Sequence, residues 1–244
     1  MNYALIFAGG VGQRMNTVSL PKQFLVANGK PIIVHTIEHF QNCNEIKGII
    51  ISCLPSFVNY MKDLVKKFYL TKVLDIVPGG NCGQDSIYNG LYALSKFAKS
   101  KDDIVLIHDG VRPLIDDKTI KDNIECVREK GNAVTVAKAI ETIVLLDKDG
   151  NVESVEDRTK CNMARAPQSF FFKDIYAAHL KAIAENKHDF IDSAMMMSYY
   201  GCKLHTVLGP ANNIKVTTPM DFYMLKAILD AKENSQIKEK QNGK

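Results

Sequence analysis

Short runs of apolar and β-branched residues alternate with helix-length segments through the first half of the chain. This alternation is typical of β-α units stacked around a largely parallel sheet. Strands are expected at residues 3–8, 47–53, 72–77, 104–108 and 133–137, and helices at 31–41, 56–68, 84–98 and 117–130. The pattern predicts the α/β fold class, with one mostly parallel sheet at its centre.

The rhythm changes after residue 140. Segments 142–146 and 152–155 flank the sequence Asp147-Lys-Asp-Gly-Asn151, which has the Asp-Gly chemistry of a tight turn. We expect an antiparallel hairpin here, an arm at about residues 139–160 that projects from the sheet. Further helices are expected at 173–186 and 190–200, a strand at 203–208, an extended piece at 213–216, and a last helix that opens at Thr218-Pro219.

No linker or repeat divides the chain before its C-terminal end. We therefore expect one domain over residues 1–231, followed by a flexible charged tail over 232–244, where lysines and glutamates dominate. A domain of this length can bury most of its apolar surface without disulfides or metal. The six cysteines include no C-x-x-C pair of the kind that holds zinc, and we expect them to be reduced.

The charge and hydropathy of the sequence argue against nucleic acids and membranes as binding partners. The chain has 31 Lys and Arg residues against 27 Asp and Glu residues, and they form no basic run that would neutralise a nucleic-acid backbone. No segment has the eighteen or so consecutive apolar residues of a membrane span, and the first residues lack the basic region of a secretion signal. We expect a cytoplasmic protein that binds neither nucleic acid nor membranes.

A glycine-rich turn, Gly9-Gly10-Val11-Gly12-Gln13-Arg14-Met15, follows the first expected strand. Backbone N–H groups in such a turn can approach phosphate oxygens closely. A dinucleotide-binding fingerprint would need a third glycine where Met15 stands, and a Walker A loop would end in Gly-Lys-Ser/Thr. Arg14 and the nearby Lys22 add two cations that suit a triphosphate, although they could also be solvated side chains on a surface loop.

Six short motifs occur in order over residues 3–230. They are Ala8-Gly9-Gly10-x-Gly-x-Arg14-Met15, Pro21-Lys22-Gln23, Gly79-Gly80 with Ser86, His108-Asp109-x-x-Arg112-Pro113, Ala166-Pro167-Gln168 and Asn213-Ile214-Lys215-Val216-Thr217. This set resembles the cytidylyltransferases that activate methylerythritol phosphate or ribitol phosphate. That family joins CTP and a polyol phosphate into a CDP-polyol, releases pyrophosphate, uses Mg²⁺ and dimerises through a β-arm. The resemblance implies a single nucleotide-binding, Rossmann-like domain that works as a homodimer.

The resemblance also implies roles for individual residues. The cations that would stabilise the transition state are Arg14, Lys22 and Lys215. The residues that would bind the nucleotide are Ala8, Gly9, Gly10, Gly12, Gly80, Ser86 and Asp109. The residues that would bind the polyol phosphate are Arg112, Thr142 and Arg158, the last two partly across the dimer interface.

Asp109 is also a candidate magnesium ligand on chemical grounds. It follows an apolar strand, at the carboxyl edge where α/β sheets place ligands. A single carboxylate next to phosphates fits a Mg²⁺ ion that keeps several waters. The residues alone leave other interpretations open: Asp109 could cap the helix after Pro113, Lys215 could be an exposed strand lysine, and the segment around Gly80 could be a plain loop.

The identity of the acceptor is left open by several departures from the family pattern. Phe7-Ala8-Gly9-Gly10 and Pro21-Lys22-Gln23-Phe24-Leu25 are closer to the ribitol phosphate branch, and Ala166 stands where a threonine is usual. Our first hypothesis is a CTP-dependent ribitol 5-phosphate cytidylyltransferase that makes a precursor of teichoic acid or capsule. The alternative is the methylerythritol phosphate enzyme of isoprenoid synthesis. A dinucleotide-dependent oxidoreductase and a non-catalytic nucleotide-binding subunit are the remaining hypotheses.

Overall fold

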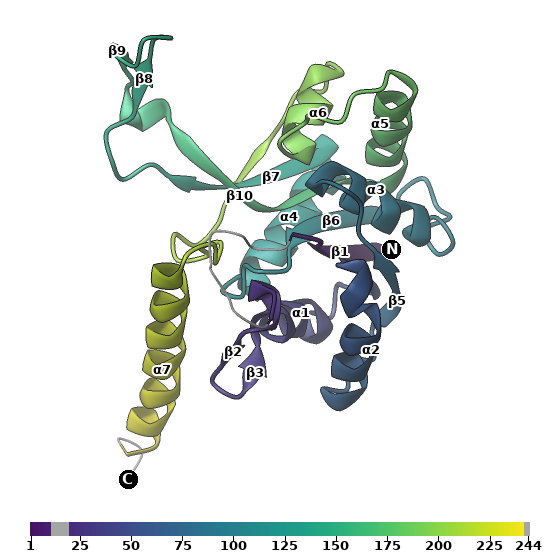
Figure 1. Ribbon diagram of the computed structural model, residues 1–244, viewed down its shortest axis with the longest axis vertical. Coiled ribbons are helices and arrows are strands. Elements are labelled where there is room, and N and C mark those ends of the chain that lie inside the picture. The colour runs from purple at the N-terminus through teal and green to yellow at the C-terminus, as the bar shows by residue number, and fades with distance from the viewer. Residues whose placement is uncertain (11–19, 242–244) are drawn as a thin grey trace.

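A seven-stranded sheet forms the centre of the computed structural model, which describes residues 1–10 and 20–241 (Figure 1). In spatial order its strands are β11 (Thr206–Leu208), β7 (Asn132–Lys138), β10 (Asn162–Phe171), β6 (Ile104–Asp109), β1 (Asn2–Ala8), β4 (Gly48–Cys53) and β5 (Val73–Pro78). All neighbouring pairs are parallel except those of β10, which runs antiparallel to both β6 and β7. The expected α/β fold class is confirmed.

Helices cover both faces of the sheet, and β1 shows why both faces need covering. Ala4 and Ile6 pack in one apolar cluster with α1 (Ile32–Asn42), α2 (Val58–Lys67) and α4 (Asp117–Lys130). Tyr3 and Leu5 point to the other face, because successive strand residues alternate between faces. There they pack with residues of three further helices, α3 (Gly83–Leu94), α5 (Phe172–Ala184) and α6 (Ser193–Tyr199).

Strand β10 is the largest difference from the expected elements. Ten residues here form a strand in the sheet, where we expected none from the sequence. The strand contains Pro167, and its pairing with β7 changes register between Ala164 and Gln168. This interruption breaks the alternation of apolar and polar residues by which a strand is recognised in a sequence.

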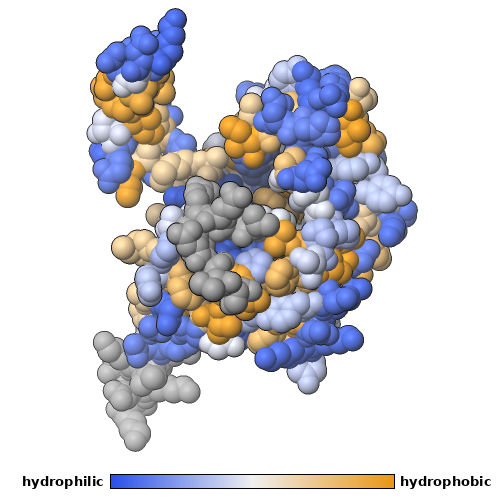
Figure 2. Space-filling view, in the orientation of Figure 1, coloured by the Kyte–Doolittle hydropathy of each residue, from blue (hydrophilic) through white to orange (hydrophobic). Residues whose placement is uncertain are grey.

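The expected arm is present. Strands β8 (Val144–Leu146) and β9 (Val152–Val155) form a separate antiparallel hairpin that projects from the body of the protein (Figure 1). Its large apolar side chains are exposed, and Figure 2 shows them as an orange area behind a hydrophilic tip. They are Ile140, Val144, Leu145, Leu146, Val152 and Val155.

The C-terminal helix α7 (Pro219–Gln241) differs from the expected tail. We expected the domain to end at residue 231 and a flexible tail to follow, but the helix continues to Gln241. No glycine or proline occurs between residues 220 and 241, and lysine, glutamate and glutamine are good helix formers. The first turns of α7 pack through Leu225 against Ile32, Val111 and Val216.

Short elements complete the fold: the 3-10 turns η2 (Lys22–Phe24), η3 (Pro55–Phe57) and η4 (Arg158–Lys160), and the two-residue strands β2 (Val26–Ala27) and β3 (Lys30–Pro31). Among the described helices, none combines the length and the apolar character that crossing a membrane requires.

The contact between α3 and β1 gives a test of the packing. A Cβ atom added at Gly90 would overlap the buried side chain of Leu5, whereas one added at Gly83, in the first turn of the same helix, would meet no atom within 4 Å. We expect Gly90→Ala to lower the free energy of unfolding by about 1–3 kcal/mol, as overpacking does. Gly83→Ala should leave it unchanged or raise it slightly. Urea denaturation checks both, and equal stability of the two variants would contradict the packing.

Candidate active site

The ends of β1 and β6 lie side by side and place the start of the glycine-rich turn, Gly9 and Gly10, next to Asp109. Phe7 of β1 is in register with Asp109 of β6, so the chain leaves both strands at the same edge of the sheet. Ligands of open α/β sheets bind at this carboxyl edge. Two cavities open there.

The first, which we call the glycine-loop cavity, has a volume of about 620 Å³. It is lined by the start of the glycine-rich turn, by the loop that follows β5 and by side chains from three other segments. The lining residues with predicted roles are Ala8, Gly9, Gly10, Lys22, Gly80, Ser86, Asp109 and Lys215.

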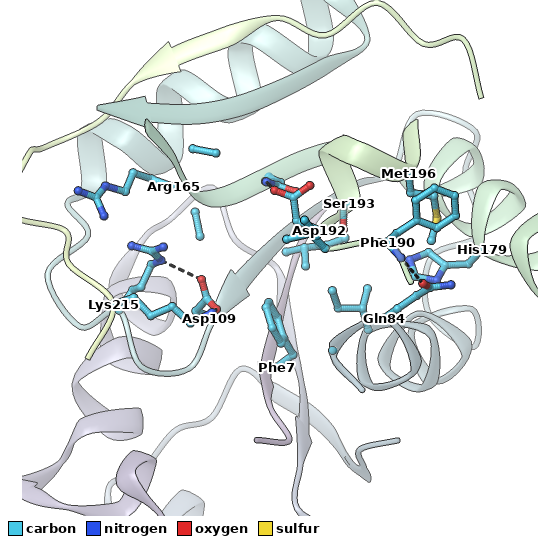
Figure 3. A pocket seen from close by; sticks show the side chains of 18 residues that line it. Phe7, Gln84, Asp109, Arg165, His179, Phe190, Asp192, Ser193, Met196 and Lys215 are labelled. Carbon is cyan, nitrogen blue, oxygen red and sulfur yellow. Dashed lines mark hydrogen bonds and ion pairs between the residues drawn. The ribbon is translucent and has the colours of Figure 1, made fainter. Parts of the chain in front are cut away.

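The second, which we call the arginine cavity, has a volume of about 310 Å³ (Figure 3). Figure 3 shows Asp109, Arg165 and Lys215 at one end of it and His179, Phe190 and Met196 at the other. Phe7, Gly83, Asp109 and Lys215 line both cavities. The two cavities therefore meet at a carboxylate and an ammonium group.

Asp109 is held between two cations. Its Oδ2 atom accepts a hydrogen bond from Nε of Arg112 at 2.8 Å, and its Oδ1 atom lies 2.5 Å from Nζ of Lys215. Burial alone would raise the pKa of Asp109, but the charges of Lys215 and Arg112 outweigh it and hold the pKa at about 2. The carboxylate is ionised at any physiological pH.

The loop after Asp109 is fixed by side chains beneath it. Nε2 of the buried His108 lies 3.1 Å from the carbonyl oxygen of Arg112, and Nε2 of His39 lies 3.0 Å from that of Pro113. The Thr36 hydroxyl donates to the carbonyl oxygen of Gly110 at 3.1 Å. Burial lowers the pKa of both histidines, that of His108 to about 4, so each imidazole is neutral and can donate its proton to the loop.

The segment that carries Lys215 is attached to the same loop. Arg112 donates through Nη1 to the carbonyl oxygen of Asn213 at 3.0 Å, and the backbone N–H of Val216 donates to that of Val111 at 2.9 Å. Asn213 also donates through Nδ2 to the carbonyl oxygen of Ala166 at 3.0 Å. These bonds connect β6, β10 and the segment before α7 into one frame around Asp109.

The glycine-rich side is equally constrained. The fully buried Gln23 donates to the carbonyl oxygens of Ala8, at 2.8 Å, and Gly10, at 3.3 Å. A Cβ atom at Gly9 would lie 2.6 Å from Oγ of Ser86, so this approach requires glycine. The Ser86 hydroxyl accepts from the N–H of Gly80 at 3.0 Å and donates to the carbonyl oxygen of Cys82 at 2.8 Å. Its one proton is thus used within the protein, and Ser86 holds the loop in shape.

Comparison with known proteins shows the family of the chain. Residues 3–231 match the family described as 2-C-methyl-D-erythritol 4-phosphate cytidylyltransferase. The chain belongs to this cytidylyltransferase family. It is therefore an enzyme that transfers a cytidylyl group, which decides against the oxidoreductase and the non-catalytic subunit.

Relatives and solved structures cover nearly the whole cytidylyltransferase chain. Proteins named ribitol-5-phosphate cytidylyltransferase are 51% identical in Streptococcus agalactiae serotype V and 44% identical in Vibrio parahaemolyticus, over 97% of this chain and 98% and 99% of theirs. The crystal structure of 4-diphosphocytidyl-2C-methyl-D-erythritol synthase from Anaerococcus prevotii superposes with a TM-score of 0.81 at 27% identity, over 94% of this chain and 96% of that one.

The structure brings most of the sequence-predicted residues of the cytidylyltransferase together, as the linings of the two cavities show. Arg112 lines the arginine cavity, whereas Gly12 and Arg14 lie outside the described residues. Thr142 and Arg158 lie in the arm, and neither is among the described residues that line the glycine-loop cavity or the arginine cavity. Nη1 of Arg158 donates to the carbonyl oxygen of Ile140 at 2.9 Å.

Asp192 and Arg165 are charged residues of the arginine cavity to which we assigned no substrate-binding role from the sequence, where Asp192 was interpreted as a helix N-cap. Asp192 caps α6 by accepting from the N–H of Met195 at 2.8 Å, and it also accepts from Nε2 of Gln168 at 2.8 Å. Arg165 lies on the strand that the sequence analysis did not expect, although it directly precedes the Ala-Pro-Gln motif. Its position next to this motif was the one feature of the sequence that could have indicated a role in the site.

His179, at the inner end of the arginine cavity, gives a test of the electrostatics. Neither ring nitrogen has a hydrogen-bond partner in the described part of the chain, and burial lowers its pKa to about 4. The imidazole is neutral when folded but protonates near pH 6.5 when unfolded, so His179 costs stability as the pH falls from about 6.5 to 4. Between pH 7 and about pH 4, we expect this titration to lower the free energy of unfolding of the wild type by roughly 3 kcal/mol more than that of His179→Phe, which has no imidazole to protonate.

Urea denaturation of both proteins at pH 7, 5.5 and 4.5 measures this difference. The wild type should lose more stability than the variant at each step toward acid. Parallel losses would contradict the burial of a neutral imidazole.

Proposed function

We propose that this cytidylyltransferase transfers CMP from CTP to ribitol 5-phosphate, giving CDP-ribitol and pyrophosphate. The choice of ribitol 5-phosphate as acceptor is supported by the 44–51% identity, over nearly the full chain, to relatives named ribitol-5-phosphate cytidylyltransferase. The superposed methylerythritol synthase from Anaerococcus prevotii shares 27%. A CDP-alditol of this kind is an activated precursor for teichoic acid or capsule.

The two cavities support a reaction in which both substrates are bound together. We assign CTP to the glycine-loop cavity, where Lys22 and the backbone of Gly9 and Gly10 face its phosphates. We assign the polyol phosphate to the arginine cavity. The α-phosphorus of CTP would then lie where the cavities meet, near Asp109 and Lys215.

In the proposed step, an oxygen of the polyol phosphate attacks the α-phosphorus of CTP. A new P–O bond forms while the bond to the pyrophosphate group breaks. A phosphate monoester is largely dianionic near neutral pH, so the attacking oxygen needs no base. The buried His108, with its pKa of about 4, holds the loop after Asp109 by a hydrogen bond and is not needed for proton transfer.

Cations must carry most of the catalysis, because two polyanions meet and charge develops on the phosphate oxygens. Lys215 lines both cavities and can therefore reach oxygens of either substrate. Lys22 lines only the glycine-loop cavity, which suits a contact with the triphosphate. The same role remains a prediction for Arg14.

Magnesium fits the site through one protein ligand. The described residues contain no group of three or more His, Cys, Asp or Glu side chains that could hold a metal ion. Mg²⁺ is, however, commonly held by one or two carboxylates together with substrate phosphates and water. Asp109 is ionised and uses two of about four lone-pair positions on its ion pairs, so it can serve as that ligand. When bound, Mg²⁺ would neutralise the phosphate oxygens.

The arm supports a homodimer. Six large apolar side chains of the arm are exposed, and among the described strands those of the hairpin pair only with each other. Thr142 and Arg158 line neither cavity of their own chain, and a partner subunit's cavity is the site they could complete. We therefore propose that the arms of two subunits pair.

The acceptor is tested by following pyrophosphate release with CTP, Mg²⁺ and a panel of polyol phosphates. We expect kcat/KM for ribitol 5-phosphate to exceed that for methylerythritol phosphate by about 100-fold or more, since discrimination by several hydroxyl contacts reaches this range. A preference for methylerythritol phosphate would refute the proposed acceptor.

The role of Lys22 is tested by reversing its charge. We expect Lys22→Glu to lower kcat/KM by about 100-fold or more, because it removes a cation from the triphosphate and adds repulsion. Lys66→Glu, on the exposed face of α2, is the matched control and should keep wild-type activity. If Lys22→Glu retains full turnover, the assignment of the glycine-loop cavity to CTP is wrong.

The dimer is tested on the arm. Leu145→Glu places a charge in the proposed interface, where its desolvation is costly, and should convert the dimer to a monomer at micromolar concentration. Leu180→Glu, at a similarly exposed leucine on α5, should remain dimeric. Sedimentation equilibrium distinguishes the two, and an unchanged mass for Leu145→Glu would contradict pairing through the arms.

A further inference from the structure

Arg165 is a partly buried cation that the reaction described above does not use. It lies on β10 and lines the arginine cavity at its charged end, with Asp109 and Lys215 (Figure 3). Its Nε atom is buried and has no hydrogen-bond partner, and no carboxylate within the described ranges forms an ion pair with its guanidinium group. Burial lowers the pKa of Arg165, and the charge of Arg112 lowers it further.

This position is unfavourable for the protein by itself. A buried polar group without a partner costs stability, and a second guanidinium nearby adds repulsion. The other two cations of the cavity, Arg112 and Lys215, each have an anionic partner because they share the carboxylate of Asp109, although the three groups together keep a net positive charge. The carboxylate of Asp192 also lines the cavity, but it is bound to Gln168 and to the N-terminus of α6.

The backbone at Arg165 is irregular in a way that suits a binding residue. Ala164 pairs with Val136 and Gln168 with Val134, so four steps along β10 correspond to two along β7. Arg165, Ala166 and Pro167 are therefore released from the ladder with β7. Such bulges occur near active sites, where they redirect side chains. The Asn213 side chain fixes this bulge by its bond to Ala166 and so connects it to the loop of Arg112.

We propose that Arg165 binds the phosphate group of the polyol phosphate. This inference rests on the proposed function of the arginine cavity. The guanidinium fork matches two phosphate oxygens, and a dianion beside it would supply the missing partner and offset the repulsion from Arg112. Arg165 lines the arginine cavity and not the glycine-loop cavity, so it should affect the binding of the acceptor and not that of CTP.

Contact with the non-attacking oxygens would also orient the acceptor. The phosphate of the polyol phosphate is both the anchor and the nucleophile, so a fork that holds two of its oxygens leaves the third for attack at the α-phosphorus. Arg165 is thus a determinant of acceptor affinity supplied by the same subunit as Asp109 and Lys215.

The test compares Arg165→Met and Arg165→Lys with the wild type. We expect Arg165→Met to raise the KM for the polyol phosphate by about 10- to 100-fold while the KM for CTP stays within about threefold, as expected for one charged hydrogen-bonding group. Arg165→Lys, which keeps the charge and loses the fork, should fall between the two. Arg128→Met, at an exposed arginine of α4, is the control and should match the wild type.

Thermal denaturation separates binding from a structural role. Removal of a cation without a partner should leave the Tm of Arg165→Met equal to or above that of the wild type. An acceptor KM within threefold of the wild type, an equal rise in both KM values, or a lowered Tm that accounts for the loss of activity would each overturn the proposal.

The acceptor used is the polyol phosphate that the wild type turns over fastest in the panel. If that is not ribitol 5-phosphate, the proposed acceptor fails while Arg165 is still tested. If the KM for the preferred acceptor is insensitive to Arg165, the role of Arg165 fails while the proposed function stands. Absence of turnover with every polyol phosphate would overturn both.

Discussion

The carboxylate of Asp109, held between Lys215 and Arg112, is the interaction on which the rest of the site depends. It joins the end of a buried strand to a loop and to the segment before the last helix, and it stands where the two cavities meet. The two cations keep the pKa of Asp109 at about 2, and the carboxylate in turn keeps two positive side chains close together in a partly buried position. A substrate phosphate that enters therefore meets cations already in place.

The scaffold explains how this arrangement is maintained without ligand. The sheet fixes the register of β1 and β6, so the glycine-rich turn and Asp109 leave the sheet at one edge. Thr36, His39 and His108 hold the loop after Asp109 from below through its carbonyl oxygens. Electrostatic stabilisation is strongest when charges need not reorganise during the reaction, and a loop with fixed carbonyls provides that rigidity.

Apolar periodicity predicted most of the fold, because strands buried on both faces form continuous apolar runs and helices show one apolar face. It missed β10, whose bulge and proline hide the pattern. For the site, Asp109 was indicated by its place after an apolar strand, whereas Arg112 and Lys215 were assigned through the resemblance of their motifs to the family. Arg165 was not found, because its significance depends on its Nε atom having no hydrogen-bond partner among the described residues, which only packing in three dimensions reveals. The use of the Ser86 hydroxyl within its own loop was likewise invisible in the sequence.

We infer that CTP and the acceptor occupy the two cavities together and that the cytidylyl group passes directly between them at Asp109. The stereochemical course at phosphorus tests this most directly. With CTP made chiral by one sulfur atom on the α-phosphate, a single in-line displacement predicts inversion of configuration in the CDP-alditol product. Retention would indicate two displacements through a cytidylyl-enzyme and would contradict this account of the site.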